Sequence, residues 1–284
     1  KECKVKPYEE KTGKGLVRHV LIRYGFTTKE IMVCLVINGK SLPASDKLIA
    51  KLSVIEGMES ISINVNTKNT NVILGDVTEC IWGKPYITDY IHLRTCGNVS
   101  AGASKDATEE FALTDTAIAY HISPQSFYQV NPVQTEKLYE TAVQFAGLTG
   151  TETVLDAYCG IGTISMVAAG RAKEVIGVEL NDSACIDARK NAKKNDCKNV
   201  KFIAADAGEY MVQLAKNTAA AKPDVVFMDP PRSGSDVKFL NSVATLAPEK
   251  IVYISCNPVT QKADIDMLKK KGYCVAKMQA VDCF

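Results

Sequence analysis

Residues 153–165 read TVLDAYCGIGTIS, an apolar run followed by two closely spaced glycines. The run at 153–158 predicts a buried strand, and the residues after Gly162 predict a helix. A turn of this kind lets backbone N–H groups approach a ligand at the start of a helix. The dinucleotide fingerprint GxGxxG is incomplete, because only Gly160 and Gly162 are present. A phosphate site is therefore less favoured, and an NAD dehydrogenase is a minor alternative.

The alternation of strand and helix continues through the second half of the chain. Four further apolar runs predict strands. These strands lie at 174–180, 200–206, 223–230 and 250–255, with helical stretches such as 182–195 and 236–245 between them. Short apolar strands that alternate with helices indicate an α/β fold with a doubly wound, mostly parallel sheet. Such a Rossmann-like domain binds its ligand beyond the carboxyl ends of the strands.

The first part of the chain has a different pattern. Residues 16–24 alternate between two faces, and 31–38 and 60–66 indicate further strands, with a helix predicted at 46–56. These features predict an α+β domain in which antiparallel strands dominate.

The boundary between the two patterns predicts two domains. We expect a smaller α+β domain over residues 1–122 and the Rossmann-like domain over 123–284, which opens with a helix at 132–146. Residues 97–110 are small and polar, so we expect them to form a mobile loop or an insertion.

Composition and charge narrow the function classes. The 284 residues are 46% hydrophobic and 23% charged, with a net charge of +2, which neither demands nor excludes a nucleic-acid partner. No apolar run approaches the roughly 20 residues of a membrane span, so we expect no membrane association. The ten cysteines form no CxxC pair, which gives a metal site no local support. Several lie in apolar runs, as expected for a reduced, cytoplasmic protein.

Three carboxylates lie at the carboxyl ends of three consecutive predicted strands. Glu179 at the end of the second strand can accept hydrogen bonds from both hydroxyls of a ribose, and Asp206 at the third can accept from an adenine amino group. Each could instead cap the helix that follows. Together with Asp156 they favour a nucleoside-containing cofactor. The D-x-x-x-G-x-G turn at 156–162 resembles that of the S-adenosylmethionine (SAM) methyltransferases, whose ligand has no pyrophosphate and so needs no third glycine.

The fourth predicted strand ends in DPPRSG, residues 229–234. The two prolines fix a rigid turn that holds Asp229 at the edge of the sheet. Arg232 suits a nearby phosphate or carboxylate, although an exposed charge without a partner is the alternative.

The fifth predicted strand delivers Cys256 within VYISCNPVTQ, residues 252–261. Asn257 is a good N-cap and Pro258 suits the first helical position, so a helix should run from there to Lys271. A thiol beside the start of a helix has a lowered pKa and a larger thiolate fraction. A thiolate near a SAM site suits methylation of a pyrimidine carbon, because its addition to carbon-6 of uracil makes carbon-5 nucleophilic.

Four motifs in this order resemble the RNA uracil-5-methyltransferases, which act on 23S rRNA and tRNA. The motifs are SFYQVNP (126–132), DAYCGIGT (156–163), DPPRSG (229–234) and ISCNPVTQ (254–261). The match is closest to the bacterial 23S rRNA branch. The resemblance implies transfer of a methyl group from SAM to carbon-5 of a uridine, through a covalent bond between Cys256 and carbon-6.

Further site residues follow from the resemblance, motif by motif. It implies contacts to SAM from the residues Gln129, Tyr158, Thr163, Glu179, Asp206 and Asp229. Phe127 and Arg232 are implied near the target nucleotide, with ordinary core packing the alternative for Phe127.

The sequence departs from the family pattern at both ends. Family members usually begin with a β-barrel that binds RNA, many carry a cysteine cluster for a [4Fe–4S] centre, and a C-terminal glutamate is the general base. None of these is visible, so we expect a fragment that binds SAM and RNA, as a monomer, but is impaired in turnover. The last antiparallel strand of the sheet is expected to be missing too.

Two other functions stay open. One is a SAM-dependent methyltransferase acting on a nucleobase nitrogen, in which Cys256 is dispensable. The other is a non-catalytic RNA-binding module that does not bind SAM.

Overall fold

The computed structural model describes residues 5–96, 113–217 and 219–283. The chain forms two compact units, one of Lys1–Tyr90 with Ala119–Ser126 and one of Ile91–Ile118 with Phe127–Phe284. It passes between them within β5 (Ile87–Cys96) and β6 (Leu113–Ile122), which form a two-stranded sheet. The single boundary after residue 122 stays a prediction, and the loop expected at 97–110 lies outside the described residues.

The second unit contains a five-stranded sheet in which every neighbouring pair is parallel. Its strands, in the order β11-β10-β7-β8-β9, are β7 (Thr153–Ala157), β8 (Glu174–Glu179), β9 (Val200–Ala204), β10 (Val225–Met228) and β11 (Lys250–Tyr253). All five predicted strands are present, and the predicted doubly wound fold is confirmed. The order reverses between β7 and β10, which makes their carboxyl ends the expected ligand site.

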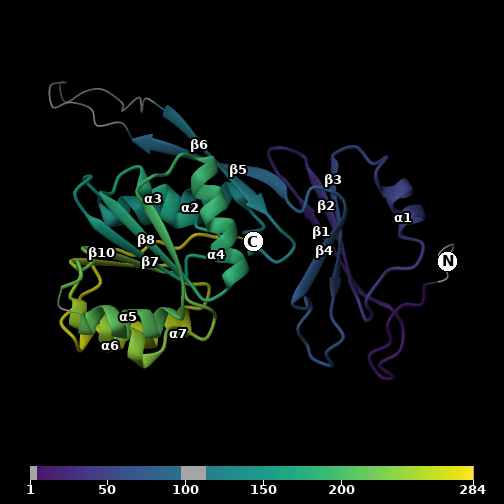
Figure 1. The fold of residues 1–284 in the computed structure, drawn as a ribbon. Helices are drawn as coiled ribbons and strands as arrows, with labels where there is room; N and C mark the ends of the chain where they lie inside the picture. The colour runs from purple at the N-terminus through teal and green to yellow at the C-terminus, as the bar shows by residue number, and fades with distance from the viewer. Residues whose placement is uncertain (1–4, 97–112, 218, 284) are drawn as a thin grey trace. The chain divides into compact units, whose positions relative to one another are not determined.

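Six helices cover this sheet (Figure 1). They are α2 (Pro132–Ala146), α3 (Thr163–Ala169), α4 (Asp182–Lys194), α5 (Ala207–Lys216), α6 (Val237–Leu246) and α7 (Pro258–Lys269). Figure 1 shows α5, α6 and α7 together on one face, with α2, α3 and α4 on the other. The described residues after α7, up to Cys283, form no further strand.

The central strands are apolar because both of their faces are covered. All four residues of β10 are buried, and Phe227 on this strand has no exposed surface. On the side of α5 and α6, Met228 packs in one cluster with Phe239 and Met211. Burying each such side chain contributes about 1.5–3 kcal/mol, so this packing sets the position of the strand ends.

Side-chain caps fix where most helices of the second unit begin, with α3 the exception. The Asn131 side chain accepts from Gln134 N before α2, and the Asn257 side chain accepts from Val259 N before α7. The predicted Asn257 cap with Pro258 as the first helical residue is therefore confirmed. Helix α7 ends at Lys269, two residues before the predicted end.

The first unit contains a four-stranded sheet in the order β1-β2-β3-β4. Its elements are β1 (Val17–Tyr24), β2 (Ile31–Ile37), α1 (Ser45–Leu52), β3 (Met58–Val65) and β4 (Val77–Gly83). The outer pairs are antiparallel, but β2 and β3 are parallel because α1 crosses over between them. Leu48 and Leu52 of α1 pack on the core residues of β2 and β3.

A carboxylate lies inside the second unit at the end of β7. Asp156 is 1% exposed, and its Oδ2 accepts a 2.6 Å hydrogen bond from the Ser165 hydroxyl of α3. Its other oxygen has no hydrogen-bond partner among the described residues. Burial raises the pKa of Asp156 to about 7, while Ser165 lowers it and Asp229 raises it further. The sequence predicts Asp156 at the ligand edge, but its carboxylate is directed into the core.

None of the helices built from the described residues has the length and apolar character needed to span a membrane.

Replacing the buried carboxylate of Asp156 should change how the free energy of unfolding depends on pH. The folded-state pKa of Asp156 lies above the unfolded value, so its protonated form stabilises the fold below about pH 4 and this stability is lost as pH rises to about 7. In Asp156→Asn this loss of stability with rising pH should be absent, because asparagine does not titrate. Since the shift from 3.8 to about 7 is about three units, the free energy of unfolding of the two proteins should diverge by up to about 4 kcal/mol.

Urea unfolding followed by circular dichroism between pH 4.5 and 7.5 measures this difference. Ser165→Ala is the matched control, because removing the hydrogen bond that lowers the pKa should extend the pH dependence to higher pH. Parallel pH profiles for the wild type and Asp156→Asn would contradict the assignment.

Candidate active site

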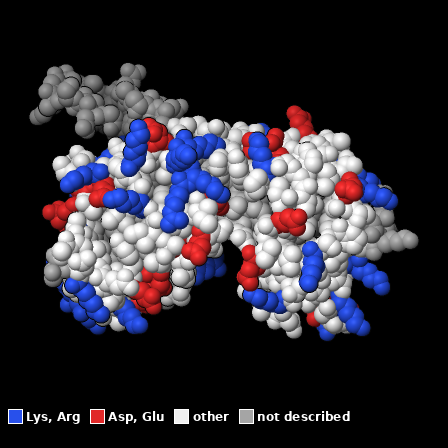
Figure 2. Space-filling view, viewed as in Figure 1, with Lys and Arg blue, Asp and Glu red and all other residues white. Residues whose placement is uncertain are grey.

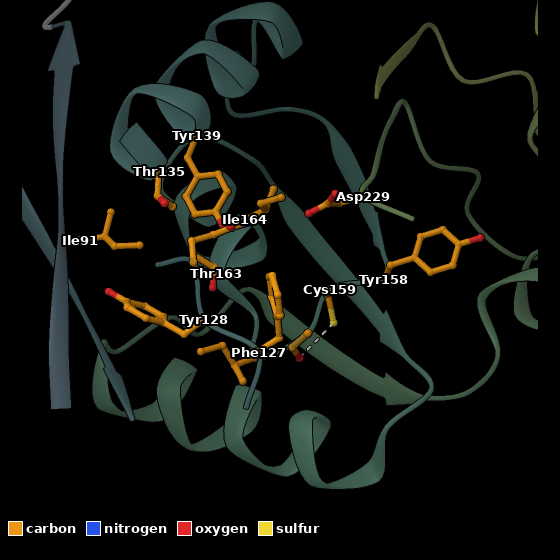
Figure 3. Close-up of a pocket in the computed structure, with 13 residues that line it drawn as sticks. Ile91, Phe127, Tyr128, Thr135, Tyr139, Tyr158, Cys159, Thr163, Ile164 and Asp229 are labelled. Atoms are coloured by element: carbon orange, nitrogen blue, oxygen red, sulfur yellow. Dashed lines mark hydrogen bonds between the residues drawn. The ribbon is translucent and has the colours of Figure 1, made fainter. Parts of the chain in front are cut away.

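A cavity opens at the carboxyl ends of β7 and β10, where the strand order reverses. Its volume is about 450 Å³, including space open to solvent. Residues 127–129 before α2, the turn after β7 and Asp229 after β10 contribute to its lining, and α2 adds Thr135 and Tyr139 (Figure 3). All of these belong to the second unit. A concavity beyond the carboxyl ends of strands whose order reverses is where ligands bind in open α/β sheets.

The two glycines in the turn after β7 have different surroundings. Gly160 has a φ of +55°, and a Cβ built on it would meet nothing within 4 Å. Gly162 has a φ of +83°, and a Cβ there would lie 2.6 Å from Cζ of Phe202. Gly162 is therefore required by packing against β9, whereas Gly160 leaves open space on the cavity side.

Tyr158 in the same turn has a φ of +67°, which is uncommon for a residue other than glycine. Figure 3 shows its ring turned away from the cavity. The ring packs at a tilt against Phe239, with centroids 5.4 Å apart, and the hydroxyl is 3.5 Å from Oγ of Ser235. Tyr158 thus joins the turn after β7 to the loop after β10.

Glu179 at the end of β8 supports the turn from beneath. Its Oε2 accepts from the Gly160 N–H at 2.9 Å, and its Oε1 accepts from the Asn181 N–H at 2.8 Å. An ionised carboxylate offers about four lone-pair positions, so two remain available for a ligand. The side chain itself does not line the cavity.

Asp206 is the N-cap of α5. Its Oδ1 accepts from the Glu209 N–H at 2.9 Å, which is the capping role that the sequence left open. It does not line the cavity either. Among the acids predicted to contact the cofactor, Asp229 alone lies in the cavity wall.

Asp229 places a carboxylate in the cavity wall. Burial raises the pKa of Asp229 to about 6, so the carboxylate is mostly ionised at pH 7 but weakly solvated. A positively charged ligand group would replace the lost solvation. Burial, and then the charge of Asp229, also raise the pKa of Tyr139, while a hydrogen bond with Thr163 opposes the rise, so Tyr139 stays neutral.

Sequence reasoning missed the contribution of α2. Thr135 and Tyr139 are four residues apart and therefore share a helix face. Both are buried, and both line the cavity. Their spacing is the same as that of ordinary core residues, so the sequence offers no signal that separates the two roles.

Residues 127–129 bring two predicted side chains to the cavity. Phe127 is 73% exposed although it lines the wall, so core packing of its ring is wrong. Gln129 lines the same wall. An exposed aromatic ring at a cavity entrance can stack on a planar ligand.

Cys256 lies just beyond β11, at the same end of the sheet as the cavity but not in its lining. The residue is exposed. Its neighbours are held in place, because the Ser255 hydroxyl donates to Asn257 O at 3.1 Å and accepts from Asn257 N at 3.0 Å. The Asn257 side chain then donates to Arg232 O at 2.9 Å, which ties this segment to the loop after Asp229.

Arg232 itself is exposed. This agrees with the alternative that the sequence left open, an exposed charge on the surface. Its backbone oxygen, not its guanidinium, makes the described hydrogen bonds to α7, from Asn257 and from Thr260 at 3.2 Å.

A different cysteine, Cys159, does line the cavity, but its thiol is unsuited to nucleophilic attack. Cys159 is buried, and burial, followed by the charges of Asp156 and Glu179, raises the pKa of its thiol well above the usual value. It is therefore protonated at neutral pH, whereas nucleophilic attack requires the thiolate.

Among the described residues, no group of three or more metal-ligating His, Cys, Asp or Glu side chains is present.

The sequence matches a family model described as tRNA (uracil-5-)-methyltransferase over residues 103–284. An uncharacterised RNA methyltransferase of Caldanaerobacter subterraneus subsp. tengcongensis is 42% identical over 284 residues, covering 100% of this chain and 57% of that protein. One from Listeria innocua is 43% identical over 278 residues, covering 98% of this chain and 56% of that protein. The chain thus spans little more than half the length of these relatives.

A solved structure is similar over most of the chain. The tRNA (uracil-54, C5)-methyltransferase of Pyrococcus abyssi, in complex with S-adenosyl-L-homocysteine, has a TM-score of 0.68 and 26% identity. The similarity covers 94% of this chain and 57% of that one. Taken with the family model, which covers well over half of the residues, these similarities show that the chain belongs to the tRNA (uracil-5-)-methyltransferase family.

Proposed function

We propose that the protein transfers a methyl group from SAM to carbon-5 of a uridine in RNA through a covalent adduct of Cys256. The observation that carries the proposal is the placement of Cys256. It is an exposed thiol at the carboxyl end of β11, tied through Asn257 and Arg232 to the loop that begins at Asp229 in the cavity wall. A cofactor cavity and a nucleophile at the same end of one sheet are what methylation of a pyrimidine carbon requires.

The cavity fits the proposed cofactor in two respects. Gly160 leaves open space beside the turn, and Asp229 supplies a weakly solvated negative charge. When bound, SAM supplies an electrophilic methyl group on a positively charged sulfur. We assign Gln129, Thr163 and Asp229 to its binding from the cavity wall. We also assign to its binding Tyr158, which lines the cavity too, and Glu179 and Asp206 at the neighbouring strand ends.

The chemistry assigned to Cys256 balances without an external oxidant. Its thiolate forms a bond to carbon-6 of uracil, and the electron pair displaced from the carbon-5 to carbon-6 double bond makes carbon-5 nucleophilic. Carbon-5 then takes the methyl group, and the bond from that group to the cofactor sulfur breaks, which leaves a neutral thioether. A base removes the proton from carbon-5, the double bond re-forms and the thiolate leaves. Phe127 and Arg232 are assigned to holding the target base and its phosphate.

For the substrate we propose RNA, and 23S rRNA in preference to tRNA, with the protein acting as a cytoplasmic monomer. Exposed basic side chains on α4 support an RNA partner despite the balanced total charge. They are Arg189, Lys190, Lys193 and Lys194. Figure 2 shows a group of basic side chains over this helix. The preference for 23S rRNA rests on the four sequence motifs.

Removing the thiol should abolish carbon methylation. The intact protein is incubated with SAM and rRNA from cells that lack its gene, and 5-methyluridine is measured by nucleoside mass spectrometry. Cys256→Ala should lower the rate at least about 10³-fold, because the covalent step is lost. Cys274→Ala removes another exposed thiol and should leave the rate unchanged. Methyl transfer to a nucleobase nitrogen that survives in Cys256→Ala would favour the N-methyltransferase instead.

Cofactor binding should weaken at low pH. The Asp229 carboxyl has a pKa of about 6 and loses its charge below that pH, so the dissociation constant for SAM should rise up to about 10-fold per pH unit below pH 6. Asp229→Asn should bind weakly with a flatter profile. Isothermal titration calorimetry between pH 5 and 8 measures both.

Absence of SAM binding at every pH would favour the non-catalytic RNA-binding module. Tight SAM binding with the same pH profile in Asp229→Asn would remove Asp229 from the cofactor site.

A further inference from the structure

Helix α7 presents one line of polar side chains to the loop that follows β10. Asn257, Thr260 and Asp264 are spaced by three and four residues, so they lie on one face of the helix. The first two donate to the same acceptor, Arg232 O, at 2.9 and 3.2 Å. The third, Asp264, is 7% exposed and accepts at Oδ2 from the Ser235 N–H at 2.9 Å.

Asp264 also bonds to the strand that leads to Cys256. The Tyr253 hydroxyl donates to Asp264 Oδ2 at 2.7 Å. Tyr253 is the last residue of β11, three positions before Cys256. One buried carboxylate oxygen therefore receives a hydrogen bond from each of the two segments that carry the proposed chemistry.

The packing around this carboxylate leaves little room for movement. Gly234 has a φ of +83°, and a Cβ built on it would lie 3.0 Å from Asp264 Oδ2 and 3.2 Å from Thr260 Cβ. A side chain at this position would crowd α7, and the positive φ would strain it as well. Beyond it, Ser235 Oγ lies 3.5 Å from the Tyr158 hydroxyl, so the contact extends to the turn after β7.

We propose that Asp264 is a positioning residue for methyl transfer, which holds the loop from Asp229 to Ser235 in register with Cys256. Asp264 does not line the cavity, so its effect passes through the backbone N–H of Ser235 and the hydroxyl of Tyr253. Because a misplacement of about 1 Å can reduce a rate about 100-fold, loss of this register should affect the transfer step more than cofactor binding. The inference rests on the proposed function.

The first arm of the test measures the reaction in the intact protein. Single-turnover formation of 5-methyluridine at saturating SAM should fall about 10- to 100-fold in Asp264→Ala. The dissociation constant for S-adenosylhomocysteine should change less than about 3-fold, since the cavity wall is kept. Asp264→Asn retains an oxygen acceptor for Ser235 and should recover the rate to within about 5-fold of the wild type.

Asn199→Ala is the matched control for lost stability. Asn199 lies at the amino end of β9 and also makes two hydrogen bonds, to Ala169 O at 2.8 Å and Ala172 O at 3.0 Å. Its rate, corrected for the folded fraction, should stay within about 2-fold of the wild type. Equal rate losses in Asp264→Ala and Asn199→Ala would overturn the positioning role.

The second arm does not depend on activity. Hydrogen exchange of the Ser235 amide should accelerate at least about 10-fold in Asp264→Ala and stay near the wild-type rate in Asp264→Asn. If Asp264→Ala does not fold, Thr260→Val removes one hydrogen bond to Arg232 O and should show a smaller change in both arms. Unchanged exchange would overturn the inference. A wild type that makes no 5-methyluridine would refute the proposed function, and the exchange arm would still decide whether Asp264 holds the loop.

Discussion

The reversal of strand order between β7 and β10 is the constraint on which the site depends. Chain that leaves β7 turns toward β8, and chain that leaves β10 turns toward β11, so the two exits separate at the edge of the sheet. The cavity opens there, with Gly160 on one side and Asp229 on the other. Because the strands are held by the apolar core on both faces, these two residues cannot move independently of the fold.

Around this point, polar contacts join segments that are far apart in sequence. Glu179 accepts from the turn that contains Gly160, and Tyr158 of that turn reaches Ser235. Ser235 in turn donates to Asp264, which also binds the end of β11. The carboxyl ends of four neighbouring strands are thus connected through side chains. This network places an exposed thiol, Cys256, in a fixed relation to the cavity.

Local sequence predicted the features that depend on neighbouring residues. The five strands, the Asn257 cap and the position of Cys256 after β11 all follow from short patterns, and the structure bears them out. The parallel pairing of β2 with β3 was missed, although the helix between them is the usual sign of a crossover. The passage of the chain between the two units within β5 and β6 rests on non-local pairing, so no local pattern could show it.

Some residues of the candidate site could be predicted from local motifs, and others could not. Gln129, Thr163 and Asp229 come from motifs and line the cavity, whereas Tyr139 could not be told from a core residue. Asp264 was missed because its partners Ser235 and Tyr253 are 29 and 11 residues away, and a mid-helix aspartate usually faces solvent. Arg232 is exposed, and its backbone oxygen makes the hydrogen bonds that hold the loop to α7.

The central claim is that the Cys256 sulfur bonds to carbon-6 of the target uracil. The most direct test uses rRNA that contains 5-fluorouridine, together with SAM and the intact protein. Fluorine replaces the carbon-5 proton, so the adduct can accept the methyl group but cannot release the thiolate. After digestion with nuclease and protease, mass spectrometry should find a methylated fluorouridine nucleotide on the peptide that contains Cys256. Release of methylated RNA with no adduct on that peptide would contradict the account.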